Sequence, residues 1–367
     1  MIDPRGLFAD MAEDDDDPFF LEPPDFAGAL ARLRAGERLR PGQMRHLSYA
    51  RPSDIPAWMA YWNDLDAARR RELVTQLVDQ AESDLHAGFG LLLEPLMDDD
   101  DPEVRAQAID GLWERQDEAF ARRLTQVLGD DPDDAVRARA AFALGAFMLQ
   151  AEEDDGWTPA METSLQALMD VAADESLASE LRRQALAAAA HSGRSALSAW
   201  IESFLAADDS LLRAGGLRAA GHAMDRSFSR EILEHMDLPD PLLRHEAAAA
   251  AGDLALAEAV PNLSNLAEFD LELEVRMMAV HALGGIGSKS AVRALKRVQS
   301  RLDPEEDEDL DEAVEDALAT AELMGDLSVM AADLHDAGAE EDEDDEALDE
   351  AIDDDADFDD LDDDVER

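Results

Sequence analysis

Three side chains that could bind a metal ion recur at one position of a repeated pattern. His191 and His222 each stand nine residues after an arginine of that pattern, and Asp253 holds the same place one repeat later. Imidazole and carboxylate groups are common ligands of zinc and iron. Neighbouring helices, however, lie about 10 Å apart, which is a wide separation for three ligands of one ion. We therefore expect these side chains to interact with carbonyl groups at helix ends, with a metal site as the alternative.

Six arginines stand at regular intervals along the chain. They are separated by 32, 45, 31, 31 and 32 residues: Arg105, Arg137, Arg182, Arg213, Arg244 and Arg276. Such a row could line a basic groove. Acidic residues precede most of the arginines, so we expect each guanidinium to pair with the acidic turn of its own or a neighbouring repeat. On this interpretation the arginines are structural.

The elements that must position these residues are helices. A small residue follows each arginine three positions later, and in most copies a glycine follows eight positions later. Offsets of −1, +3 and +7 share one helical face, and we expect the glycine to end the helix. Second amphipathic segments lie between these helices, so the unit is helix–turn–helix and must stack on its neighbours to bury its apolar face. The pattern predicts an all-α fold, a right-handed α-solenoid of about six to seven helix pairs.

Other catalytic patterns are missing from the sequence. There is no cysteine, which excludes disulfides, thiolate ligands and a cysteine nucleophile. There is no Gly-rich phosphate loop, no nucleophile elbow and no His-Glu-x-x-His motif. The chain carries 88 acidic and 31 basic residues, a net charge of −57. It therefore has no excess of cations to neutralise a nucleic-acid backbone, and we expect no direct nucleic-acid binding.

The charge is concentrated at the ends of the chain. The last 65 residues hold 33 acids and one base, and like-charge blocks with few aromatic residues are typical of disordered segments. This distribution divides the chain into five parts: a disordered acidic N-terminal segment (1–26), a helical N-terminal cap (27–85), the repeat array (86–302), a C-terminal capping helix (303–325) and a disordered acidic tail (326–367).

Three copies of the repeat carry a recognisable motif. They read Asp-Pro-Glu-Val-Arg at 101–105, Asp-Ala-Val-Arg at 134–137, and Glu-Val-Arg followed by Ala-Val-His-Ala-Leu-Gly within 274–284. This pattern resembles HEAT repeats, specifically the HEAT-like repeats of the phycobilisome-lyase type, over roughly residues 86–302. The resemblance implies an α-solenoid used as a protein-binding scaffold.

One dipeptide is similar to the signature of a metalloenzyme family built on such repeats. His245-Glu246 matches the His-Glu pair of deoxyhypusine hydroxylase, a family that implies one such pair in each of four repeats. The matching positions here include Ala106-Gln107 and Met277-Met278, so a di-iron site would lack its ligands. The phycobilin-lyase activity known in relatives is not identified by the repeats alone.

We therefore interpret the chain as a non-enzymatic scaffold or adaptor for protein–protein interaction, whose acidic ends favour basic partners. We predict that Phe142, Arg218 and His281, each five residues after its repeat arginine, line a concave binding surface. No catalytic residue, cofactor, signal peptide or membrane span is predicted, and we expect a cytoplasmic, bacterial monomer. Two alternatives stay open: a phycobilin-lyase-like or metal-dependent enzyme or enzyme subunit, and a nucleic-acid mimic or chaperone of basic proteins.

Overall fold

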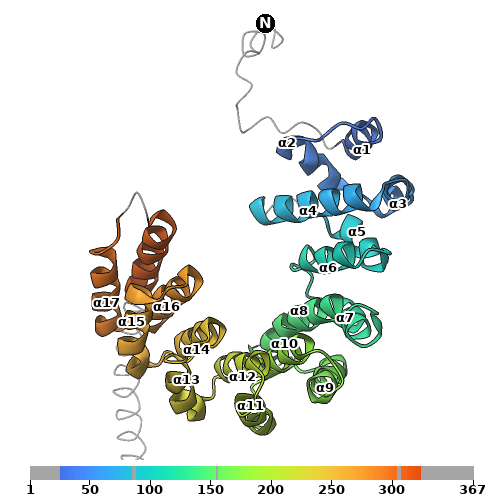
Figure 1. Ribbon diagram of the computed structural model, residues 1–367. Helices are drawn as coiled ribbons and strands as arrows, with labels where there is room; N and C mark the ends of the chain where they lie inside the picture. Colours follow the sequence, from blue (N-terminus) through green and yellow to red (C-terminus); the bar gives the residue numbers. More distant parts are fainter. Residues whose placement is uncertain (1–24, 85–87, 154–155, 304–306, 324–367) are drawn as a thin grey trace, which may run out of the picture. The chain divides into compact units, whose positions relative to one another are not determined.

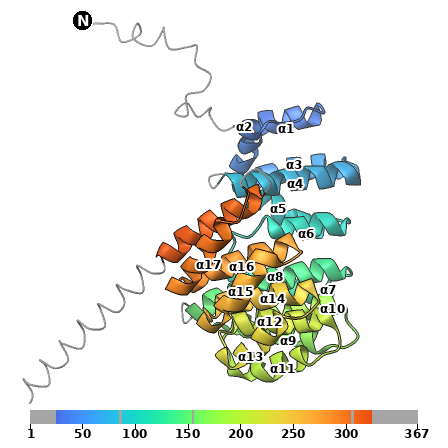
Figure 2. The same ribbon diagram turned by 60° about the vertical axis from the view of Figure 1, so that its left-hand side comes forward.

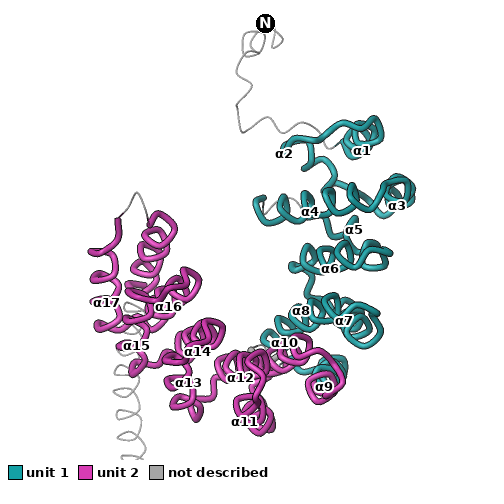
Figure 3. Tube along the Cα trace, in the orientation of Figure 1, with its two compact units in different colours: residues 1–151, 156–168 teal, residues 152–155, 169–367 magenta. Residues whose placement is uncertain are grey.

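The computed structural model describes residues 25–84, 88–153, 156–303 and 307–323. These residues form helices and connecting turns, with no β-strand among them. They fall into two compact units, one comprising the described residues up to 151 together with 156–168, and the other comprising residues 152–153 and the described residues from 169 onward (Figure 3). The acidic segments predicted to be disordered are residues 1–26 and 326–367; of these, residues 1–24 and 326–367 lie outside the described chain.

Unit 1 is a succession of short helices, followed by the first helices of the repeat array (Figure 1). Its elements are α1 (Phe26–Arg34), α2 (Pro41–Met44), η1 (Arg45–Tyr49), η2 (Pro52–Asp54), α3 (Ile55–Asn63), α4 (Ala67–Ser83), α5 (Gly90–Leu93), η3 (Glu94–Asp98), α6 (Pro102–Asp110), α7 (Glu118–Asp130) and α8 (Asp134–Glu153). The division between the units falls within α9 (Pro159–Ala173). Phe26, which we assigned to the N-terminal segment, is buried and begins α1, with Asp25 as its N-cap.

Unit 2 repeats a pair of helices. Its elements are α10 (Ser179–Ala190), η4 (Ser195–Leu197), α11 (Ser198–Leu205), α12 (Ser210–His222), η5 (Arg226–Phe228), α13 (Ser229–His235), α14 (Pro241–Asp253), η6 (Ala257–Ala259), α15 (Val260–Phe269), α16 (Leu273–Ile286) and α17 (Lys289–Gln299), followed by a helix over residues 308–323. Helices α10, α12, α14 and α16 pack against one another in succession, while α11, α13 and α15 pack against α12, α14 and α16 (Figures 1 and 2). The predicted all-α solenoid of stacked helix pairs is confirmed.

Aspartate side chains cap the N-termini of three repeat helices. Asp101, Asp209 and Asp240 each accept a hydrogen bond from a backbone N–H in the first turn of the next helix. Pro102 and Pro241 follow two of these caps, where a missing backbone N–H leaves no helical hydrogen bond unmade. The acidic turns therefore define where α6, α12 and α14 begin.

The glycines at the +8 position have a different role from the one predicted. Gly221, Gly252 and Gly284 lie inside α12, α14 and α16 and do not have the left-handed backbone that ends a helix. A Cβ added to each would lie 2.9–3.0 Å from a Cα of the next helix: Ala250 for Gly221, Ala282 for Gly252 and Ala317 for Gly284. These three positions therefore have no room for a side chain, because the neighbouring helices contact each other there through their backbones.

Candidate functional site

The side of α10, α12, α14 and α16 that points away from α11, α13 and α15 forms the open face of unit 2. Its direction follows from α12, where a Cβ on Gly216 would lie 2.9 Å from the backbone nitrogen of Leu205 at the end of α11. Arg218 is two residues further on, about 200° around the helix, and so lies on the opposite side. His281 holds the same repeat position on α16 and is exposed.

The structure thus places two of the three predicted binding residues on the open face of unit 2. Phe142, the third, lies on α8 of unit 1, where 64% of its surface is exposed. At the same repeat position, α10 and α14 carry Ala187 and Ala249, which are buried. The exposed side chains therefore do not form an unbroken row at this position within unit 2.

An ion pair connects α12 with α14 at the open face. The Arg218 Nε donates a hydrogen bond to the Glu246 Oε2 at 2.6 Å, and only 7% of the Glu246 side chain is exposed. The Nδ1 of His245 lies 3.8 Å from the other carboxylate oxygen of Glu246, and burial lowers the pKa of His245. Because its carboxylate is bound by Arg218, Glu246 serves as an inter-repeat contact, whereas the resemblance to deoxyhypusine hydroxylase would make it an iron ligand.

Two of the candidate metal ligands stack on each other. The rings of His191 and His222 are 3.8 Å apart between centroids, with an angle of 20° between their planes. The His222 Nδ1 lies 3.0 Å from the carbonyl oxygen of Ala187. Since a carbonyl only accepts, Nδ1 carries the proton and donates it, which leaves Nε2 without one in the neutral ring.

Burial keeps both rings neutral at physiological pH. Burial lowers the pKa of His191 to about 4, and the nearby His222 and Arg218 act in the same direction, while Asp253 opposes them. Burial also lowers the pKa of His222, although its hydrogen bond to the Ala187 carbonyl partly opposes this. The pair is therefore a stack of uncharged imidazoles.

Asp253 lies beside this stack but does not complete a metal site. Its Oδ2 would be 2.7 Å from a Cβ added to Gly221 on α12. Desolvation by burial raises the pKa of Asp253, whereas the nearby Arg218, His191 and His281 lower it. The residue still reaches solvent. Ring nitrogens coordinate a metal in the ring plane, so two nearly parallel rings do not direct their lone pairs at one ion. Within the described residues, no group of three or more His, Asp or Glu side chains is arranged to hold a metal ion.

Two of the repeat arginines form bidentate ion pairs with the next repeat. Nε and Nη2 of Arg105 donate to the two carboxylate oxygens of Asp131 at 2.8 Å, and the same atoms of Arg244 donate to Asp270 at 2.6 and 2.8 Å. Nη1 of each arginine donates to carbonyls of its own preceding turn, such as that of Asp99 at 2.9 Å for Arg105. These are ion pairs of the kind that we expected between a repeat arginine and the acidic turn of a neighbouring repeat.

The other repeat arginines mainly cap the helix that precedes them. The Nε of Arg137 donates to the carbonyl of Leu128 at 2.8 Å, that of Arg182 to the carbonyl of Ala172 at 3.1 Å, and that of Arg276 to the carbonyl of Ala267 at 3.2 Å. Arg137 also binds Asp134 at 3.0 Å, and Arg276 lies 3.9 Å from Asp307. The Nη2 of Arg213 donates to the Ser210 hydroxyl at 3.2 Å, while its buried Nε has no hydrogen-bond partner among the described residues. A cation at a helix C-terminus also interacts favourably with the helix dipole.

Several solved structures are similar to this chain. Human deoxyhypusine hydroxylase is 20% identical over 74% of this chain and 96% of its own, with a TM-score of 0.33. The complex of CpcE and CpcF of phycocyanin lyase from Nostoc is 16% identical over 63% of this chain and 94% of that chain, with a TM-score of 0.43. Yeast importin-beta is 14% identical over 81% of this chain and 46% of its own, with a TM-score of 0.44. At these identities the likeness concerns the fold alone.

The sequence itself matches a family of repeats. The comparison with curated proteins finds no match. The family model for HEAT repeats matches residues 90–190 and 229–319, which together make up more than half of the 367 residues. These regions contain α6, α8, α10, α14 and α16, whose arginines and small residues produce the stacking described above. The chain therefore belongs to the HEAT-repeat family.

Proposed function

We propose that this HEAT-repeat protein is a non-enzymatic scaffold that binds one or more proteins through the open face of unit 2. The observation that carries the proposal is that three of the side chains able to do chemistry there are engaged in contacts between repeats. Glu246 binds Arg218, and His191 stacks on His222. Arg218, Asp253 and His281 reach solvent on helices that pack backbone to backbone.

A rigid polar face suits recognition of a folded surface. Backbone-to-backbone contact limits relative movement of the helices, so that Arg218 and His281 keep their positions before a partner binds. Preorganisation reduces the entropy lost on binding. Polar groups with fixed positions contribute more to specificity than to affinity, which fits an adaptor that selects its partner.

The acidic ends favour basic partners. Residues 303–367 carry a net charge of −32, and such a charge attracts cations over a Debye length of about 8 Å at physiological ionic strength. Attraction of this kind raises the association rate, while contacts at the open face hold the partner. Cytoplasmic location and the monomeric state remain predictions. Among the described residues, no helix is both long enough and apolar enough to cross a membrane.

A capture experiment tests this proposal. The full chain, a 1–325 truncation and an Arg218→Glu/His281→Asp variant would be immobilised, and captured proteins identified at about 50 and 300 mM salt. We expect the double variant to lose the partner, and the truncation to retain it with weaker salt dependence. Capture that is insensitive to both changes would contradict the proposal. A double change at exposed Arg230 and Glu202, on α13 and α11, serves as the matched control.

A further inference from the structure

The N-terminal cap contains a basic region within a very acidic protein. Residues 27–51 hold six arginines and one glutamate, a net charge of +5, in a chain whose net charge is −57. Most of these arginines are exposed. An exposed cluster of one sign attracts ligands of the opposite sign.

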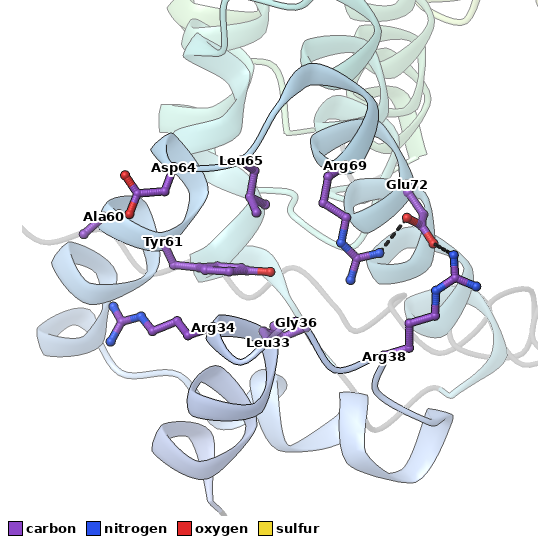
Figure 4. A pocket seen from close by; sticks show the side chains of 10 residues that line it. All are labelled: Leu33, Arg34, Gly36, Arg38, Ala60, Tyr61, Asp64, Leu65, Arg69 and Glu72. Carbon is purple, nitrogen blue, oxygen red and sulfur yellow. Dashed lines mark hydrogen bonds and ion pairs between the residues drawn. The ribbon is translucent and has the colours of Figure 1, made fainter.

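Two of these arginines line a pocket of about 720 Å³ in unit 1. Its walls come from the end of α1 and the following turn (Leu33, Arg34, Gly36, Arg38), the end of α3 (Ala60, Tyr61, Asp64) and the start of α4 (Leu65, Arg69, Glu72). In Figure 4, the ring of Tyr61 lies across the pocket with its hydroxyl directed towards Arg69. Leu33, Leu65 and the Tyr61 ring provide an apolar part, and the guanidinium groups provide a cationic part.

The guanidinium groups are held in place but keep donors for a ligand. Glu72 accepts from Arg69 at 2.6 Å and lies 3.2 Å from Arg38, so one carboxylate positions both cations (Figure 4). Nη2 of Arg34 donates to the carbonyl of Ala57 at 2.8 Å. Each guanidinium has five N–H donors in a fork that suits carboxylates. With three arginines against Asp64 and Glu72, the pocket has a net positive charge.

The chain itself carries a segment of complementary chemistry shortly before α1 in the sequence. Residues 14–22 read Asp-Asp-Asp-Asp-Pro-Phe-Phe-Leu-Glu, with carboxylates for the arginines and aromatic side chains for the apolar part. Phe26 stands nine positions after Asp17, and an extended chain over nine positions spans about 30 Å. Helix α1, whose far end lines the pocket, has nine residues and is about 13 Å long. The segment can therefore reach the pocket within the same molecule.

We propose that the pocket formed by α1, α3 and α4 binds the acidic aromatic segment at residues 14–22 of its own chain. Carboxylates of the segment bind Arg34, Arg38 and Arg69, and a phenylalanine packs on Leu33, Leu65 and the ring of Tyr61. The short connection makes this an intramolecular event with an effective concentration of about a millimolar. An acidic aromatic segment of another protein then competes for the same pocket.

A peptide-binding experiment tests this proposal on the full chain. The probe is a fluorescent peptide of residues 12–24, and its anisotropy is measured with the wild type and with a D14N/D15N/D16N/D17N variant. We expect the peptide to bind the variant at least about tenfold more tightly, because the variant's own segment competes weakly. Binding to the variant should weaken as salt is raised.

Two further substitutions in the D14N/D15N/D16N/D17N background separate the pocket from general electrostatics. Arg38 is 80% exposed at its side chain and lines the pocket, so Arg38→Gln should lower peptide affinity about tenfold without loss of fold. Arg32 is exposed on α1 outside the pocket, and Arg32→Gln removes the same charge as a matched control. Equal losses for both substitutions, or no peptide binding at all, would overturn the proposal. Stronger binding of a peptide of residues 340–364, or displacement of the probe by millimolar inorganic phosphate, would also overturn it.

Discussion

The adjacent glycines of α16 offer a matched test of the close packing in unit 2. A Cβ added to Gly284 would lie 3.0 Å from the Cα, Cβ and carbonyl oxygen of Ala317, in the helix over residues 308–323. A Cβ added to Gly285 would meet the carbonyl oxygen of Gly252 at 3.8 Å, an ordinary van der Waals contact. The same change to alanine therefore meets crowded backbone at one position and only an ordinary contact at the next.

The two changes should move stability in different directions. Alanine is favoured over glycine inside a helix by about 0.5–1 kcal/mol, so Gly285→Ala should raise the free energy of unfolding by about that amount. At Gly284 the same gain is opposed by overpacking, which costs about 1–3 kcal/mol. We expect the two variants to differ by about 1–3 kcal/mol, with Gly284→Ala the less stable.

Urea unfolding followed by circular dichroism measures this difference from the shift in midpoint. Hydrogen exchange of the α16 amides then shows whether the change is local to unit 2. Equal stability of Gly284→Ala and Gly285→Ala would refute the reasoning, because α16 and the helix over residues 308–323 would then lie farther apart than backbone contact.

Three further predictions concern the contacts between repeats and the metal content of the protein. Burial lowers the pKa of His191 in the folded state to about 4, so as the pH falls below about 6.5 the unfolded chain binds a proton at this residue before the folded chain does. Between pH 6.5 and 4.5 the free energy of unfolding should therefore fall by about 2–3 kcal/mol more for the wild type than for His191→Gln. Urea unfolding at each pH measures this difference. Asp270→Asn breaks the bidentate ion pair with Arg244, in which only 4% of the Asp270 side chain is exposed. This change should lower the free energy of unfolding by about 3–5 kcal/mol. Arg230→Gln, which breaks the exposed ion pair with Glu234, should leave the urea midpoint unchanged. Elemental analysis of the purified protein should find no stoichiometric iron or zinc; one equivalent of either would contradict the non-enzymatic assignment.

The repeat was predictable because its arginines mark each helix at a constant register. The second amphipathic segments predicted between the arginine-bearing helices are helices as well, for example α7 (Glu118–Asp130) and α17 (Lys289–Gln299). The longer spacing of 45 residues between Arg137 and Arg182 includes a longer helix, since α8 continues to Glu153 through residues that favour helix.

The contacts of the candidate site could not be predicted from spacing alone. An interhelical distance of about 10 Å is typical, but a Cβ added to Gly215 on α12 would lie only 2.9 Å from the Cα of Arg183 on α10. These two helices therefore lie closer together, and His191 and His222 stack at 3.8 Å between ring centroids. Arg105 has an aspartate 26 residues later and pairs with it. Arg276 has Leu302 at that distance and caps a helix instead. One arginine motif therefore serves two kinds of contact.

Photo-crosslinking in cells tests the central claim most directly. A photoreactive phenylalanine analogue placed at His281, on the open face, would be compared with the same group at Arg230, which is exposed on α13 on the other side of unit 2. The scaffold account predicts a discrete protein adduct from position 281 that is absent from position 230. An adduct from position 230 alone, or the same adducts from both positions, would contradict binding through the open face.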